Sequence, residues 1–103
     1  MNIHELNEEI MKSEKAVLDN NLELAKLEKQ LSLRRLTVND SFDTTNKEYS
    51  NQQKRDVFID VDSQVIDLTK QIKDLRFKVA VLDIECRHKL RNFEILLKSN
   101  LGE

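Results

Sequence analysis

The sequence FIDVDSQVIDLTKQIKDLRFKVAVLDIECRHKLRNFEIL, residues 58–96, carries an apolar side chain at nearly every third or fourth position. The repeating positions are Phe58, Val61, Val65, Leu68, Ile72, Leu75, Val79, Leu82, Cys86, Lys89, Phe93 and Leu96. Such spacing, sustained over the whole stretch, underwinds an α-helix to about 3.5 residues per turn and supercoils it around a partner helix. The stretch therefore predicts one helix of a coiled coil.

The composition limits how often the chain reverses. The 103 residues contain no proline and one glycine, 35% are charged, and 5% are aromatic. Glycine and proline supply many of the turns that a compact globule needs, and aromatic side chains fill much of a broad core. We therefore expect one all-α domain over residues 1–103, a long antiparallel helical hairpin (coiled coil) that oligomerises into a helical bundle.

Charge and cysteine content indicate the cellular setting. The formal net charge of −2 argues against a protein whose main task is coating nucleic acid. The single Cys86 excludes an intrachain disulfide and suits a reducing compartment. The first residues do not fit a signal peptide, and the longest apolar run, residues 79–82, is far shorter than the ~20 residues that cross a membrane. We expect a soluble, cytoplasmic protein without membrane contact.

A first helix is predicted over about residues 2–36. Its main heptad position holds Ile3, Ile10, Val17, Leu24, Leu31 and Val38. The companion position is more polar and holds Leu6, Ser13, Asn20, Leu27 and Arg34. Asn20 either fixes register and oligomer state or lies in a loosely packed, wet layer. A second apolar strip (Met11, Leu18, Leu22 and Ala25) makes the apolar band too wide for one partner helix, which predicts at least three helices in cross-section.

Residues 37–50 form the predicted loop between the two helices. The segment is rich in Asn, Asp, Ser and Thr, whose side chains favour turns, and Phe42 and Tyr49 are expected to pin it against the helix ends. Ser50 and Gln53 fit a capping box at the start of a second helix over about residues 51–99.

The two predicted helices differ in length. At 1.5 Å per residue, helix 51–99 is roughly 72 Å long and helix 2–36 roughly 51 Å long. Antiparallel pairing would therefore leave the apolar residues from about Cys86 to Leu101 without a partner in their own chain. Just before them, Phe77, Val81 and Ile84 form a strip on the face opposite the main seam.

Contiguous exposed apolar surface of this extent marks an interface. We therefore predict that the chain forms a homo-oligomer, or binds another protein, through its C-terminal third. The predicted interface consists of Leu75, Phe77, Val79, Val81, Leu82, Ile84, Cys86, Leu90, Phe93, Leu96 and Leu97.

No catalytic residues are predicted. Cys86 and His88 would approach His4 in an antiparallel hairpin, but tetrahedral zinc needs four ligands, so a seam cysteine beside an exposed histidine is preferred to a shared metal. Gly102 is the only glycine, which excludes a glycine-rich phosphate loop. We expect no metal, no cofactor and no enzymatic activity.

Acidic residues open the second predicted helix. Asp56, Asp60, Asp62 and Asp67 resemble the carboxylate sets of metal-dependent nucleases, but those sit in a concave pocket that a hairpin does not offer. We interpret them as solvated side chains, the first of which interact favourably with the helix N-terminus.

Two basic clusters suggest nucleic-acid contact as an alternative. Arg34, Arg35, Lys47, Lys54 and Arg55 gather near the turn, where Tyr49 offers a ring for base stacking. Arg87, His88, Lys89 and Arg91 gather near the C-terminus. Because acidic residues alternate with the first cluster, surface ion pairing is the preferred interpretation and nucleic acid the alternative partner.

The segment Lys47-Glu48-Tyr49-Ser50-Asn51-Gln52-Gln53-Lys54-Arg55, followed by a long helix with an apolar end, resembles a class of small helical-hairpin proteins. These proteins occur in phage and prophage early regions, often beside replication and recombination genes. The matching residues are Tyr49, Ser50, Asn51, Lys54 and Arg55, and the resemblance covers about half the chain. It implies a phage origin and a setting in nucleic-acid metabolism, but no activity.

Three hypotheses of function follow. The first is a non-enzymatic coiled-coil interaction or scaffold protein, phage-encoded, which acts through protein–protein contacts. The second is an accessory single-stranded nucleic-acid-binding factor in phage recombination or replication. The third is a phage inhibitor of a host enzyme, whose aspartates would imitate phosphates.

Overall fold

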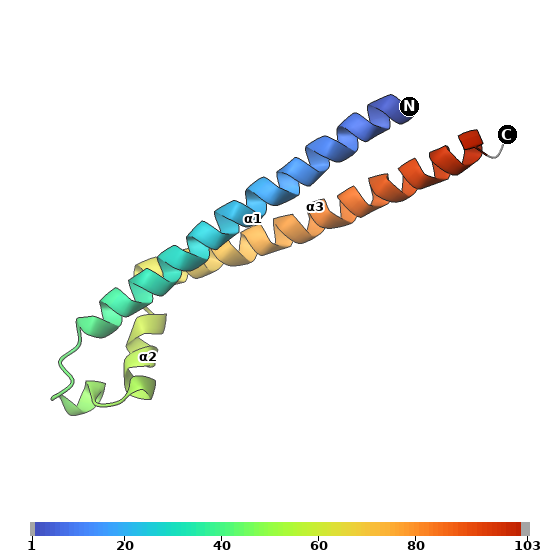
Figure 1. Ribbon diagram of the computed structural model, residues 1–103. Helices are drawn as coiled ribbons and strands as arrows, with labels where there is room; N and C mark the ends of the chain where they lie inside the picture. The colour runs from blue at the N-terminus through green and yellow to red at the C-terminus, as the bar shows by residue number, and fades with distance from the viewer. Residues whose placement is uncertain (1, 102–103) are drawn as a thin grey trace. The chain divides into compact units, whose positions relative to one another are not determined.

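The computed structural model describes the backbone of residues 2–101 and the side chains of residues 2–99. Its elements are helix α1 (Ile3–Asp40), the 3-10 turn η1 (Lys47–Tyr49), helix α2 (Gln52–Asp60) and helix α3 (Ser63–Leu101), shown in Figure 1. The predicted all-α antiparallel hairpin is confirmed, with α1 and α3 as its arms. The chain divides into two compact units, Met1–Glu23 with Leu75–Glu103, and Leu24–Asp74.

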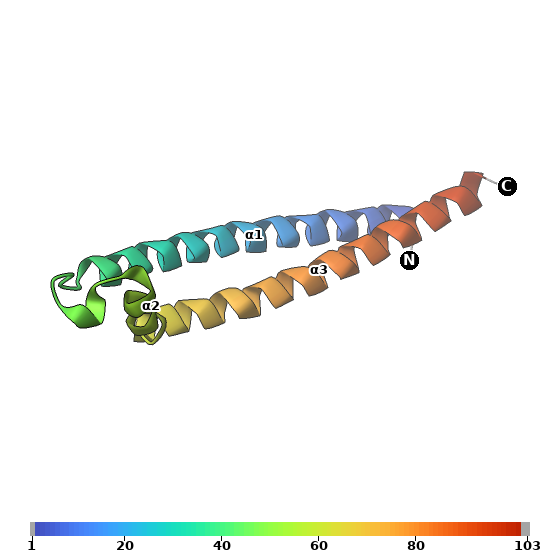
Figure 2. The ribbon, with the colours of Figure 1, turned by 90° about the horizontal axis from the view of Figure 1, so that it is seen from below.

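The first unit pairs the start of α1 with the end of α3 in antiparallel directions (Figure 2). The Asn2 side chain caps α1, because its Oδ1 accepts a hydrogen bond from the backbone N–H of Glu5 at 2.8 Å. Leu6, Ile10 and Cys86 are buried and form the core of this unit. All three occupy predicted seam positions, so the heptad pattern identified this core correctly.

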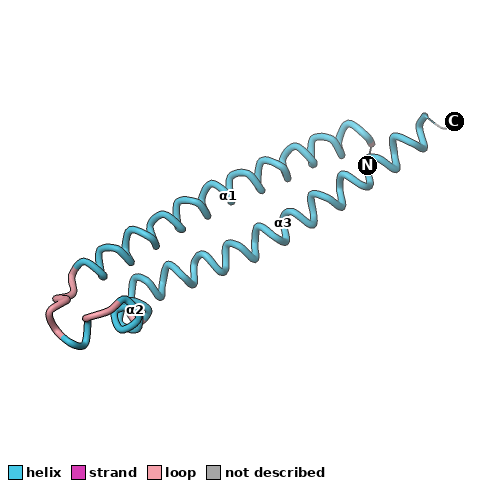
Figure 3. Tube along the Cα trace, turned by 60° about the horizontal axis from the view of Figure 1, so that its bottom comes forward, coloured by secondary structure: helices cyan, strands magenta, loops and turns pink. Residues whose placement is uncertain are grey.

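The predicted unpaired C-terminal overhang is wrong. Cys86 is only 6% exposed, and Lys89 Nζ donates a hydrogen bond to Ser13 Oγ of α1 at 2.8 Å. Only the last turns of α3 extend past the first residues of α1 (Figure 3). The length argument failed because the second helix is interrupted: α3 has 39 residues, which nearly equals the 38 of α1.

The second unit contains the end of α1, the turn, α2 and the start of α3. Its buried side chains are Leu27, Ile59, Val65 and Ile72. The seam prediction holds from Val65 onward, where the predicted positions are buried or half-buried. It is wrong for Phe58 and Val61, which are exposed, because α2 is a separate helix that buries Ile59 instead.

The single helix predicted over about residues 51–99 is broken at Val61 and Asp62. Asp62 Oδ2 accepts a hydrogen bond from the backbone N–H of Val65 at 3.1 Å, so Asp62 is the N-cap of α3. At the other side of the break, the Val61 N–H bonds to the Ile59 carbonyl and closes α2. On the single helix predicted over residues 51–99, Asp62 would be a solvated surface residue, whereas its side-chain oxygen caps a new helix.

Both helix ends at the turn differ from the predicted bounds. The α1 helix continues past residue 36 to Asp40. Thr37 lies within it, and its Oγ1 donates a hydrogen bond to the Leu33 carbonyl at 2.9 Å. The α2 helix is capped by Asn51, whose Oδ1 accepts from the Lys54 N–H at 2.9 Å. The predicted cap Ser50 instead donates its hydroxyl to the Lys47 carbonyl at 3.1 Å.

Three aromatic rings hold the turn. Phe42 stacks on Tyr49 with ring centroids 4.7 Å apart, and Tyr49 meets Phe58 of α2 edge-on at 5.1 Å. The expectation that Phe42 and Tyr49 pin the loop to a helix is therefore confirmed. Aromatic pairs at these separations stabilise a fold beyond the apolar area they bury.

Candidate interaction surfaces

The outer face of α1 in the first unit carries an exposed apolar stripe. Met11, Leu18 and Leu22 are 64%, 58% and 57% exposed. At about 3.6 residues per turn, these positions share one face, roughly opposite the seam residues of the same helix. Isolated exposed leucines need no explanation, but large apolar side chains aligned on one face indicate a contact surface. We call these three residues the α1 stripe.

The outer face of α3 carries a second stripe. Phe77, Val81 and Ile84 are 73%, 38% and 64% exposed. Their spacing of four and three residues places them on one side of the helix, away from the buried Cys86. We call these three residues the α3 stripe. Ile95 continues the same face and is also exposed.

The predicted interface residues separate into two groups in the structure. The first group is buried or half-buried within the hairpin: Leu75, Val79, Leu82, Cys86, Phe93 and Leu96. The second group is exposed: Phe77, Val81, Ile84, Leu90 and Leu97. Only the exposed group, which includes the α3 stripe, is available to another molecule.

A polar layer interrupts the seam of the first unit. Lys89 is half-buried and donates to Ser13, as described above. Asn20 donates its side-chain N–H to the Ala16 carbonyl of its own helix at 2.7 Å, so this hydrogen bond does not cross the seam. A lysine paired with a serine at facing seam positions favours this register of the two helices, because sliding would take the half-buried ammonium group away from its acceptor.

Two arginines of the predicted basic cluster are bound to carboxylates of the same unit. Arg34 donates from Nε and Nη2 to the two oxygens of Asp62 at 3.0 and 2.9 Å. This bidentate hydrogen bond lowers the pKa of Asp62 to about 2 and raises the pKa of Arg34. Arg35 pairs with Asp60 at 2.9 Å.

The other residues of the cluster hold the turn. Arg55 donates to Asn39 Oδ1 at 3.0 Å and to the Tyr49 carbonyl at 2.8 Å. Lys54 Nζ donates to the Lys47 carbonyl at 3.0 Å. The structure therefore brings predicted residues together, but the cationic groups of Arg34, Arg35, Lys54 and Arg55 are engaged within the chain. This geometry favours a structural role over phosphate binding.

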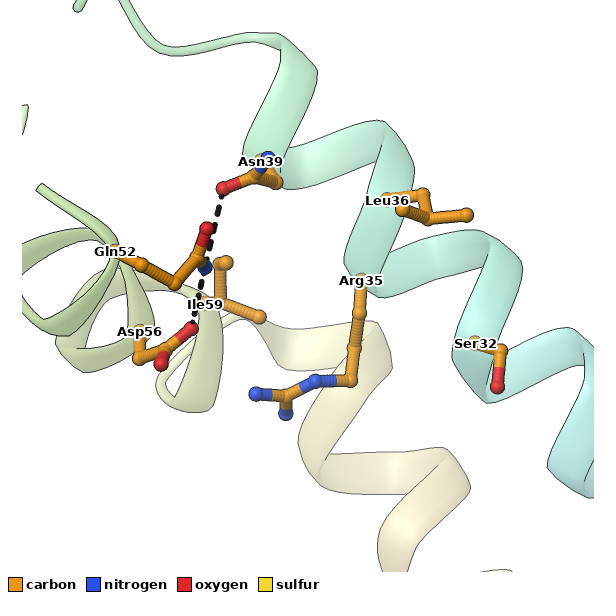
Figure 4. Close-up of a pocket in the computed structure, with 7 residues that line it drawn as sticks. All are labelled: Ser32, Arg35, Leu36, Asn39, Gln52, Asp56 and Ile59. Atoms are coloured by element: carbon orange, nitrogen blue, oxygen red, sulfur yellow. Dashed lines mark hydrogen bonds between the residues drawn. The ribbon is translucent and has the colours of Figure 1, made fainter.

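A shallow pocket of about 400 Å³ lies beside the turn. It is lined by Ser32, Arg35, Leu36, Asn39, Gln52, Asp56 and Ile59 (Figure 4). Gln52 Nε2 donates to Asn39 Oδ1 at 3.3 Å and to Asp56 Oδ1 at 2.8 Å, which links α1 to α2 across the pocket. None of these seven residues is a histidine or a cysteine, so the pocket wall offers no histidine as a base and no Cys–His pair.

The candidate metal ligands are apart from one another. His4 Nε2 lies 3.3 Å from Glu8 Oε1, while Cys86 is buried and His88 is exposed. Within residues 2–101, no group of three or more His, Cys, Asp or Glu side chains is placed to hold a metal ion. Among the same residues, no helix combines the length and apolar character needed to span a bilayer.

The aspartates at the start of the second predicted helix each have a local partner. Asp60 and Asp62 bind the two arginines described above, Asp56 accepts from Gln52, and Asp67 accepts from Gln71 Nε2 at 2.8 Å. They do not converge on one point. Their contacts agree with the interpretation of these residues as ordinary surface and capping groups.

Neither the burial of Ile59 nor the capping role of Asp62 was predicted from the sequence. The signal for Asp62 was present: Asp-Ser precedes the apolar run that starts at Val65, a pattern typical of a helix start. No family model, no curated protein and no solved structure matches this chain.

Proposed function

We propose that this chain is a non-enzymatic helical-hairpin interaction protein that self-associates and acts through protein–protein contacts. The observation that carries the proposal is the pair of exposed apolar stripes on the outer faces of α1 and α3. The same stripes support assembly into a larger helical array, because each helix offers an apolar face that its own partner helix does not cover.

The size of the stripes sets the strength of the contact. Burying three large apolar side chains contributes about 5–9 kcal/mol. Association itself costs about 4–15 kcal/mol in lost freedom of motion. At most about 5 kcal/mol therefore remains, which corresponds to a dissociation constant of roughly 0.2 mM, so a single stripe supports only a weak contact that forms at high protein concentration.

Sedimentation equilibrium over a concentration series tests the proposal. We expect the mean mass of the wild-type chain to rise with concentration. Phe77→Glu should weaken association by about tenfold or more, because the apolar contact is replaced by a charge. Lys78→Gln is the matched control, since it alters the net charge by the same amount on an exposed position outside the stripe. A wild-type chain that stays monomeric at every concentration would refute the proposal.

Single-stranded nucleic-acid binding remains a second proposal with less support. It would need Arg34, Arg35, Lys54 and Arg55 to release the partners they hold within the chain. The stripes, by contrast, are exposed without any rearrangement.

A further inference from the structure

The break between α2 and α3 is short, and no proline or glycine imposes it. Only Val61 and Asp62 separate the two helices. Residues 52–101 contain neither proline nor glycine, and no residue that the structure describes has a positive φ angle. Val61 has φ −98° and ψ 0°, in the right-handed helical region. Sharp kinks come from proline, glycine or an inserted side chain, so the side chains at this corner hold the break.

Asp62 supplies the hydrogen bond that the break removes from the helix. In a continuous α-helix, the N–H of Val65 would bond to the Val61 carbonyl, four residues earlier. In the structure it bonds to Asp62 Oδ2 at 3.1 Å. The next N–H, that of Ile66, already bonds to the Asp62 carbonyl at 2.9 Å in the helical pattern. Arg34 of α1 holds the same carboxylate with two hydrogen bonds. One side chain, held from α1, therefore replaces the backbone acceptor.

The heptad pattern runs through the break without interruption. Phe58, Val61 and Val65 keep the spacing of three and four residues that the seam of α3 continues. A straight helix would therefore carry Phe58 and Val61 on the side that faces α1. In the bent form Val61 is instead 66% exposed and Phe58 39% exposed, and Ile59 is buried in their place. The bent and straight forms thus bury different side chains of the same segment.

The end of α1 offers a surface for the straight form. Arg34 and Asp62 lie at one level of the hairpin, and counting back along antiparallel helices from this pair brings Val38 to about the level of Phe58. Val38 is a predicted seam residue, is half-buried, and lies within α1. Residues 41–51 between α1 and α2 can span roughly 36 Å when extended, more than the about 8–10 Å between packed helices, so the turn permits both forms.

We propose that α2 and α3 form a two-state hinge, which is bent at residues 61–62 while Arg34 holds Asp62 as a cap and straightens into one helix when this contact is released. In the straight form, Phe58 and Val61 extend the seam along the end of α1. The hinge lies within the second unit and does not depend on self-association through the stripes.

The hinge changes what the turn end of the hairpin offers to another molecule. In the bent form, Gln52 donates to Asn39 across the pocket between α1 and α2 (Figure 4). In the straight form, Gln52 lies past the end of α1, so the pocket is absent. A ligand that binds only one form shifts the hinge toward that form.

A distance measured across the break tests the hinge. In a Cys86→Ala background, Gln53→Cys and Lys73→Cys carry spin labels at exposed positions, and dilution with unlabelled chain removes distances between copies. Twenty residues of continuous helix are roughly 30 Å long. The bent form gives a shorter distance, because α2 runs across the direction of the start of α3 (Figures 1 and 3). Labels at Lys78→Cys and Lys98→Cys, equally far apart in sequence but within α3, give the reference for a continuous helix.

Replacing Asp62 by alanine should straighten the hinge. Asp62→Ala removes the cap and the partner of Arg34, and it places the best helix former at the break. We expect the wild type to show mainly the shorter distance. The variant should shift mainly to the reference distance, with helicity by circular dichroism at least equal to that of the wild type. Asp67→Ala is the matched control, because it removes the same charge from an exposed position of α3 that accepts from Gln71 of its own helix; it should keep the shorter distance.

Each other outcome decides against the hinge. If Asp62→Ala keeps the wild-type distance, or if Asp67→Ala shifts as well, Asp62 does not hold the break. If the distances broaden while helicity falls, α2 has melted and has not joined α3. A wild-type chain already at the reference distance has no hinge to release. Ile59→Ala leaves the cap in place and should loosen α2 without producing the reference distance. Its appearance in Ile59→Ala would show that the apolar contact, and not the cap, holds the break.

Discussion

Shortening Ile59 to alanine should release α2 from the rest of the second unit. Ile59 is 2% exposed, and of the described residues of α2 it alone is buried. The helix has nine residues, whereas isolated helices shorter than about 12–15 residues are marginal in water. Its stability therefore depends on contacts outside the helix, of which the buried Ile59 side chain makes one, and Ile59→Ala should lower the free energy of unfolding of α2 by about 2–4 kcal/mol.

Native-state hydrogen exchange measures this loss locally. We expect the amides of α2 to exchange about 30-fold to 1,000-fold faster in Ile59→Ala, as 2–4 kcal/mol implies, while those of the first unit change little. Val57→Ala is the matched control, because Val57 lies on the same helix and is 64% exposed. If Ile59→Ala accelerated exchange no more than Val57→Ala, the assignment of Ile59 as the anchor of α2 would be refuted.

Two further predictions concern the turn. The pKa of Asp62 is lowered from 3.8 to about 2 in the folded chain, so its contribution to stability is present above pH 4 and is lost as the pH falls towards 2. Thermal melts should therefore show that the stability difference between wild type and Asp62→Asn shrinks over that range, and a constant difference would contradict the role of Arg34. Replacing Lys54 and Arg55 by Glu should leave oligomerisation intact; oligonucleotide binding by the wild type at ~50 mM salt that this variant loses would revive the nucleic-acid hypothesis.

The seam of the hairpin could be predicted because it is a local, periodic signal. From Val65 to Leu96, the heptad positions are buried or half-buried as expected. The break at Asp62 could not be obtained in the same way. The local sign, Asp62 and Ser63 before the apolar run, competes with a heptad pattern that continues back through Val61 and Phe58, and the partner Arg34 lies 28 residues away in the sequence. The error about the C-terminal overhang followed directly from that missed break.

The candidate interaction surfaces were also predicted only in part, because the apolar stripes are a periodic signal and the ion pairs of the basic cluster are not. The strips containing Leu18 and Phe77 were recognised from their spacing, and both are exposed. The basic cluster was also recognised, but composition does not reveal which arginines already have carboxylate partners. Those pairs join α1 to the corner before α3, and only the folded chain brings them together.

The reactivity of the buried thiol reports how often the two helices of the first unit separate. Cys86 is the only cysteine in the chain and lies in the core of the first unit. A thiol reagent too bulky for the closed seam reacts only while the two helices are apart, so the labelling rate reports how often they separate. Any molecule that binds the outer faces and slows that separation would therefore lower the labelling rate of Cys86 without contacting it.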